Sequence, residues 1–80
     1  MRAKGKLHKV VCKNIRSARL AAGKTQQQVA DELGVRQPSY AEIESGRCEP
    51  GLGIFERLAP VLNCKPHELL DPEFNRELVA

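Results

Sequence analysis

Apolar residues recur along this 80-residue chain at the spacing of helices, and no stretch keeps the two-residue alternation of a strand beyond a few positions. Residues 7–22 carry apolar side chains at helical separations, and Gly23 follows as a stop signal. Thr25 fits the N-cap of a second helix, and Gln28 three residues later completes a capping-box pattern. Gly34 ends that second helix, so the first part of the chain predicts two consecutive helices.

Three further helices are predicted by the second half of the pattern. Pro38 fits the first turn of a third helix, where the missing N–H of proline costs little, and Gly46 ends that helix. Residues 52–62 repeat apolar side chains at helical spacing, and Pro60 is expected to bend this fourth helix because it removes a backbone hydrogen bond. A short fifth helix after Pro66 carries two leucines. The pattern therefore predicts an all-α fold of five helices.

Charge is distributed unevenly along the chain. The net charge is +3, yet residues 1–24 hold eight basic and no acidic side chains, while residues 25–80 sum to −5. We divide the chain into a basic N-terminal arm at residues 1–9, a helical domain at residues 10–71 and a C-terminal tail at residues 72–80. A basic arm is attracted to polyphosphate, but a solubilising tail has the same composition, so both interpretations stay open.

Composition argues against several other classes of protein. No apolar run approaches the length of a membrane span, so no membrane association is expected. Three widely spaced cysteines do not make a disulfide framework, which favours a cytoplasmic protein. Cys64 and His67 have the spacing of half a zinc site, but no second pair completes it, so no metal or other cofactor is expected. His8 and His67 lack a partner pattern for catalysis, so an enzyme is not expected.

The tight turn predicted at Gly34 is typical of a helix-turn-helix, in which the second helix can enter a major groove. A longer set of residues strengthens this interpretation: Ile15-Arg16-x-x-Arg19, Gly23-Lys24-Thr25-Gln26-x-x-Val29-Ala30-x-x-Leu33-Gly34-Val35, Gln37-Pro38, Ile43-Glu44-x-Gly46-Arg47, Pro50, Leu58-Ala59 with Leu62, and Glu68-Leu69-Leu70. This set closely resembles the Cro/phage-repressor (XRE) family, and the resemblance covers roughly residues 11–70. The resemblance implies a compact five-helix lambda-repressor-like domain that binds double-stranded operator DNA, usually as a two-fold homodimer.

The same resemblance implies which residues contact DNA. The third helix becomes the recognition helix, with Gln37 at a base-reading position where its amide can pair with adenine. Gln26 matches a position that grips a phosphate and supports the base-reading side chain, and Arg47 matches a contact to the DNA backbone. The full set of implied DNA-contacting residues is Thr25, Gln26, Arg36, Gln37, Ser39, Tyr40, Glu42 and Arg47.

Five positions refine this mapping. Tyr40 stands where the family has an aliphatic residue, which favours core packing with the hydroxyl at the rim over a phosphate contact. Arg36 replaces the Ser or Thr that caps the recognition helix in the family, so that cap is expected to be weaker. Glu42 brings a negative charge towards the DNA. Arg19 and Glu44 are expected to form the family's ion pair between the first and third helices.

Residues and resemblance together predict a sequence-specific DNA-binding transcriptional regulator. It would be a repressor or a controller protein that binds a palindromic operator through the major groove. One alternative is the antitoxin of a toxin–antitoxin pair, which binds a toxin protein and autoregulates its operon. A third interpretation is a protein-interaction adaptor that kept the fold and lost DNA binding, for which the acid-rich C-terminal half of the chain is the argument. The residues alone leave the choice open.

Overall fold

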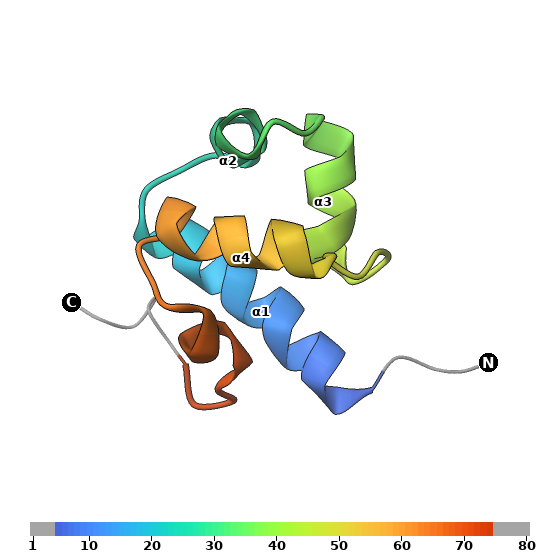
Figure 1. Ribbon diagram of the computed structural model, residues 1–80, viewed down its shortest axis with the longest axis vertical. Coiled ribbons are helices and arrows are strands. Elements are labelled where there is room, and N and C mark those ends of the chain that lie inside the picture. Colours follow the sequence, from blue (N-terminus) through green and yellow to red (C-terminus); the bar gives the residue numbers. More distant parts are fainter. Residues whose placement is uncertain (1–4, 75–80) are drawn as a thin grey trace.

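Helical segments make up most of the computed structural model, which describes residues 5–74 (Figure 1). Four of them are α-helices: α1 (Lys6–Ala21), α2 (Gln26–Leu33), α3 (Gln37–Ser45) and α4 (Leu52–Val61). The last segment, η1 (Pro66–Leu70), is a 3-10 helix. No strand occurs between residues 5 and 74. The all-α prediction is therefore confirmed, whereas the prediction of a fifth α-helix is wrong.

The fifth segment is a 3-10 helix because it is short and its ends are constrained. Its backbone bonds span three residues, from Glu68 N to Lys65 O at 2.9 Å and from Asp71 N to Glu68 O at 3.2 Å. The side chain of Asn14 in α1 donates from Nδ2 to Leu69 O at 2.9 Å and to Asp71 O at 2.8 Å. These two bonds hold the end of η1 against α1.

Glycines in the left-handed conformation end the first three helices, as the sequence predicts. Gly23, Gly34 and Gly46 have φ angles of 72°, 77° and 88°. At Gly34 this conformation shapes the fold, because Val35 N donates to Ala30 O at 3.0 Å and only three residues separate α2 from α3. The tight turn of the predicted helix-turn-helix is therefore confirmed.

The starts of the helices agree only in part with the predictions. The capping box of α2 is present, since Gln28 N donates to Thr25 Oγ1 at 3.1 Å and Thr25 N donates to Gln28 Oε1 at 2.7 Å. Arg36 makes no side-chain capping bond to α3, as expected of a residue that replaces Ser or Thr. Helix α1 begins at Lys6, so residues 6–9 of the segment assigned to the basic arm are helical. Residues 1–4 of the predicted arm and residues 75–80 of the predicted tail lie outside the described residues.

Pro60 lies inside α4, close to its C-terminal end. The proline lies in the last turn, and the helix stops one residue later, at Val61. Asn63 then adopts a positive φ of 58°, and Lys24 Nζ donates to the carbonyl oxygen of Val61 at 2.8 Å. The end of α4 is thereby tied to the segment between α1 and α2.

One hydrophobic core lies between the inward faces of all five segments. Its buried members are Val11, Ile15, Ala18, Val29, Ala30, Leu33, Tyr40, Ile43, Leu58, Leu62 and Leu69. Helix α1 packs against α3 and η1, while α4 packs against α2 and η1. In Figure 1, α2 lies above α4, α3 runs down on the right to the level of α4, and η1 lies below α4. This arrangement places the helix-turn-helix at one end of the molecule.

Candidate nucleic-acid interface

Helices α2 and α3 form a helix-turn-helix whose second helix has a buried and an exposed face. Figure 1 shows α2 nearly end-on at the top of the molecule and α3 running down its side. Along α3, Tyr40, Ile43 and Glu44 are buried, whereas Ser39 and Glu42 are exposed. Helix α3 therefore has one side turned to the core and another turned to solvent. The exposed side of α3 is therefore accessible to a ligand as large as a DNA duplex.

A chain of side-chain hydrogen bonds joins the start of α3 to α2. Gln37, the first residue of α3, donates from Nε2 to Gln26 Oε1 at 2.8 Å. Gln26, the first residue of α2, donates in turn from Nε2 to Glu44 Oε1 at 3.1 Å. Both glutamines are half-buried. The amide of Gln37 is therefore held in place before any ligand arrives.

The carboxylate of Glu44 is the centre of this network. Arg19 donates from Nε to Glu44 Oε2 at 2.5 Å and from Nη2 to Oε1 at 3.2 Å, and the Tyr40 hydroxyl donates to Oε2 at 2.6 Å. The Arg19 and Glu44 side chains are only 10% and 3% exposed. The predicted ion pair between the first and third helices is therefore confirmed. Throughout the described chain, every buried side-chain nitrogen or oxygen has a hydrogen-bond partner.

Burial and hydrogen bonding act in opposite directions on the ionisation of Glu44. Burial raises the pKa of its carboxyl, but the hydrogen bonds from Arg19, Tyr40 and Gln26 outweigh burial and lower the pKa from its ordinary value of 4.5. The hydrogen bond to Glu44 raises the pKa of the Arg19 guanidinium. Burial, followed by the hydrogen bond to Glu44, raises the pKa of the Tyr40 hydroxyl. At neutral pH the cluster is therefore an ion pair with a neutral phenol beside it.

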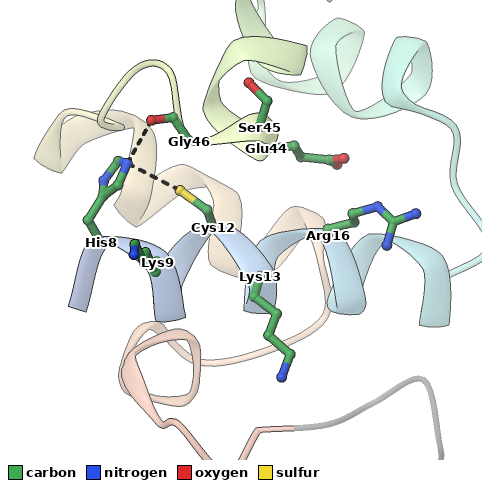
Figure 2. Close-up of a pocket in the computed structure, with 8 residues that line it drawn as sticks. All are labelled: His8, Lys9, Cys12, Lys13, Arg16, Glu44, Ser45 and Gly46. Atoms are coloured by element: carbon green, nitrogen blue, oxygen red, sulfur yellow. Dashed lines mark hydrogen bonds between the residues drawn. The ribbon is translucent and has the colours of Figure 1, made fainter. Parts of the chain in front are cut away.

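Helix α1 contacts the end of α3 at a second place, through His8. The ring Nε2 of His8 lies 2.9 Å from the carbonyl oxygen of Gly46 and 3.7 Å from Sγ of Cys12 (Figure 2). A carbonyl oxygen only accepts hydrogen bonds, so Nε2 carries a proton and donates it. Helix α1 thus holds the C-terminal end of α3 both here and through Arg19.

Basic side chains of α1 are exposed beside the end of α3. Lys9, Lys13 and Arg16 are four and three positions apart and, with His8, border a cavity of about 470 Å³. Figure 2 shows the side chain of Lys13 pointing away from α3. The exposed side of α1 therefore carries positive charge close to the end of α3, with the ammonium group of Lys13 on the side away from α3.

Most of the predicted DNA-contacting side chains are accessible. The exposed ones are Thr25, Arg36, Ser39, Glu42 and Arg47, and the half-buried ones are Gln26 and Gln37. Tyr40 is different, because it is 0% exposed and its hydroxyl bonds to Glu44 inside the fold. This burial supports core packing for Tyr40, the interpretation that the sequence favours over a phosphate contact.

Two polar residues have structural roles that the sequence pattern does not assign. Asn14 is 1% exposed and bonds two carbonyl oxygens of the η1 segment, and His8 bonds the carbonyl oxygen that follows α3. For Asn14 a signal exists in the sequence, since it lies three residues after Val11 and directly before Ile15 on the apolar side of α1. A polar residue at such a position requires buried partners. His8 carries no comparable signal.

Neither a membrane span nor a metal cluster occurs in the part of the chain that the structure describes. None of the helices found there is both long enough and apolar enough to cross a bilayer. No three or more His, Cys, Asp or Glu side chains within residues 5–74 are grouped so that they could hold a metal ion. Cys64 and His67, the half-site noted in the sequence, belong to no such group.

Comparison with protein families agrees with this geometry. The family HTH_3, described as helix-turn-helix, matches residues 15–69, which extend from α1 to η1. The chain therefore belongs to this helix-turn-helix family, as its resemblance to the Cro/phage-repressor (XRE) proteins predicts.

Curated relatives carry names of transcriptional regulators, a class of proteins that are not enzymes. The SPbeta prophage-derived HTH-type transcriptional regulator YonR of Bacillus subtilis is 32% identical over 56 residues, which cover 70% of this chain and 52% of the relative. The HTH-type regulator YqaE of the same organism is 31% identical over 65 residues, or 81% of this chain and 56% of the relative. An HTH-type regulator of Archaeoglobus fulgidus is 33% identical over 55 residues, or 69% of this chain and 79% of the relative. The chain spans about half the length of the two Bacillus relatives.

Two solved structures share the fold. A hypothetical transcription factor from Neisseria, NHTF, superposes with a TM-score of 0.79 at 24% identity, covering 91% of this chain and 86% of its own. The clp gene regulator ClgR from Corynebacterium glutamicum superposes with a TM-score of 0.78 at 22% identity, covering 85% of this chain and 72% of its own. At these identities the likeness shows the fold alone.

Proposed function

We propose that this chain is a sequence-specific DNA-binding transcriptional regulator that represses by occupying a palindromic operator as a homodimer. The observation that carries the proposal is the Gln37 amide, held at the N-terminal end of α3 by Gln26. In helix-turn-helix proteins that end of the recognition helix points into the major groove. A glutamine amide has a donor beside an acceptor, which matches N7 and N6 of adenine.

Contacts to the DNA backbone would come from side chains around this reading position. Arg47 follows the C-terminal end of α3 and is exposed, and Arg36 precedes the helix and is also exposed. Both have the reach to bind phosphate oxygens. Such contacts position the protein on the duplex without reading its sequence. The proposal therefore separates one base-reading residue from at least two backbone-binding residues.

Two variants test this division. Gln37→Ala should weaken binding to the selected operator by about 1–3 kcal/mol and relax the preference at one base pair in each half-site. Arg47→Ala should weaken binding to all sequences about equally and lower the log–log salt slope by roughly one unit. Gln27→Ala is the matched control, because Gln27 is an exposed neighbour on α2 whose amide bonds Asp31.

The experiment has two stages. An operator is first selected from random duplex DNA with the unmodified chain. Each variant then competes for that operator and for all its single-base substitutions at several salt concentrations. A uniform loss of affinity for Gln37→Ala, or a changed base preference for Arg47→Ala, would contradict the assignment. Failure to select any sequence would contradict the function itself.

Homodimer formation is supported by apolar side chains that the monomer leaves exposed. Leu52, Leu7 and Leu70 are 87%, 58% and 40% exposed and border one cavity of about 430 Å³. A second copy of this chain would cover them and would add the second half-site that a domain this small needs for specificity. In such a dimer the two recognition helices should be about 34–36 Å apart.

Ultracentrifugation of the chain at micromolar concentration, alone and with palindromic DNA, tests the homodimer. Leu52→Glu should dissociate it, whereas Leu20→Glu, at a leucine that is 42% exposed and does not border this cavity, should leave it intact. A monomer in both conditions would contradict the homodimer. That result would favour the second candidate function, an antitoxin, in which a toxin protein covers the same apolar surface.

A further inference from the structure

We propose that Glu44 is a positioning residue for base recognition: acting through Gln26, its buried carboxylate sets which way round the Gln37 amide presents its donor and acceptor to DNA. The proposal rests on the proposed function, because it takes Gln37 as the base-reading residue. It goes further by assigning a specificity role to a side chain that lies inside the fold and touches no DNA.

The direction of the hydrogen bonds that link Glu44, Gln26 and Gln37 is set at Glu44, because every acceptor position of its carboxylate is occupied. Its Oε2 accepts from Arg19 Nε and from the Tyr40 hydroxyl, and its Oε1 accepts from Arg19 Nη2 and from Gln26 Nε2. An ionised carboxylate only accepts, and it offers about four lone-pair directions. All four are occupied. The carboxylate therefore stays in place between its donors. Because it only accepts hydrogen bonds, it can bond the nitrogen end of the Gln26 amide but not the oxygen end.

The orientation of the Gln26 amide then fixes the orientation of the Gln37 amide. Because Gln26 directs its Nε2 to Glu44, its Oε1 faces Gln37. Gln37 must therefore donate, and its Nε2 lies 2.8 Å from Gln26 Oε1. A free glutamine amide has no such constraint, since its oxygen and nitrogen ends are nearly the same size and differ mainly in their hydrogen bonding. The orientation of the Gln37 amide is thus decided by an ionised group two side chains away.

This orientation has a consequence for the base pair that Gln37 meets. Gln37 Nε2 uses one hydrogen on Gln26, which leaves one N–H and Oε1 side by side, with the donor on the Gln26 side. Across the major groove an A·T pair presents adenine N7, the N6 amino group, thymine O4 and the thymine methyl group in that order, and a T·A pair presents them in the reverse order. At a fixed place in the groove, the Gln37 amide therefore faces N7 and N6 of one pair but O4 and the methyl group of the other. An amide locked in one orientation distinguishes the two, whereas an amide free to flip accepts both.

The experiment measures the ratio of the affinities for two duplexes that carry the A·T pair in opposite orientations. Binding is compared on four duplexes that carry A·T, T·A, G·C or C·G at the pair whose preference Gln37→Ala removes. The unmodified chain should prefer one orientation of the A·T pair over the other by about tenfold or more. Glu44→Gln, whose amide can donate or accept, should reduce that ratio at least about fivefold. In a Gln26→Ala background, Glu44→Gln should have no further effect on the ratio.

Two further variants separate polarity from stability. Glu44→Asp keeps a carboxylate beside Arg19 but shortens its reach to Gln26, so it too should reduce the ratio. Tyr40→Phe removes one donor and leaves the bond between Gln26 and Glu44 in place, so it should lower the unfolding midpoint and retain the ratio. Gln27→Ala on the same helix should change neither quantity. All binding is measured at a temperature below the unfolding midpoint of the least stable variant, so that every variant is folded.

The outcomes distinguish this proposal from the function on which it rests. If both Glu44 variants keep the unmodified ratio while Gln37→Ala abolishes it, Gln37 reads the base and Glu44 does not position it. If the unmodified chain shows no preferred base pair at any position, the proposed function itself fails. A ratio lost by Tyr40→Phe to the same extent as by Glu44→Asp would mean that general loosening of the cluster, not polarity, is responsible.

Discussion

The ion pair between Arg19 and Glu44 should be the largest single polar contribution to the stability of this fold. Arg19→Met keeps most of the aliphatic length of the side chain but removes three hydrogen bonds, two to Glu44 and one from Nη1 to Lys24 O at 2.9 Å. The carboxylate of Glu44 would stay buried with only Tyr40 and Gln26 as donors. A buried charge that loses its counter-ion is strongly destabilising.

The magnitude follows from the burial of the pair. Breaking a buried ion pair by removing one partner costs about 3–5 kcal/mol, and the two donors that remain on Glu44 place the expected loss near the lower end, at about 3 kcal/mol. An 80-residue domain has about 4–12 kcal/mol of stability in total. The loss should therefore lower the unfolding midpoint by about 12–24 °C. Glu32→Gln, which breaks the exposed ion pair with Lys24, should cost below about 1 kcal/mol.

Urea unfolding followed by far-ultraviolet circular dichroism measures these losses. A double-mutant cycle with Arg19→Met and Glu44→Gln isolates the interaction between the two side chains, and we expect a coupling of about 2 kcal/mol. Single losses that add to within about 0.5 kcal/mol would refute the reasoning, because they would mean that the two side chains contribute independently.

Three further predictions concern single contacts. Thr25→Ala should cost about 1 kcal/mol in urea unfolding, because it removes the hydroxyl that caps α2; an unchanged midpoint would contradict a role for the cap. Asn14→Ala should cost about 1–3 kcal/mol, because it leaves the carbonyl oxygens of Leu69 and Asp71 without their donor, and Asn14→Asp should not restore the loss. Since the pKa of Glu44 is lowered in the folded state, its contribution is complete above the ordinary pKa of 4.5 and is lost as the pH falls further; the stability difference between the unmodified chain and Glu44→Gln should therefore shrink below about pH 4.5, and a constant difference would contradict this.

The local features of the fold could be predicted from the sequence because each depends on a few neighbouring residues. The capping box needs only Thr25 and Gln28, and the left-handed glycines act at the position where they occur. The two bonds from Asn14 to the end of η1 escaped prediction because Asn14 is 55 residues away from Leu69 in the chain. Helical periodicity predicts where apolar residues pack, but it does not show which polar side chain binds a distant carbonyl oxygen.

The candidate site shows the same division between local pattern and long-range contact. The pair of Arg19 and Glu44 and the support of Gln37 by Gln26 could be predicted through the family resemblance, which supplies the spatial neighbours. The bond from Gln26 to Glu44 joins these two features into one network. It depends on the relative positions of α2 and α3 and follows from neither pair alone. For Tyr40 the aliphatic family position favours core packing, and its side chain is fully buried.

Helix α3 is restrained at both of its ends. Gln26 holds its first residue, while Arg19 and His8 hold its last turn and the glycine that follows. The conformational entropy of ordering this helix is therefore lost during folding and not at the moment of binding, which favours affinity. If α3 keeps its conformation on binding, any change of shape that the complex requires must occur in the DNA duplex. Base pairs that α3 never touches would then contribute to specificity through the ease with which they bend or twist.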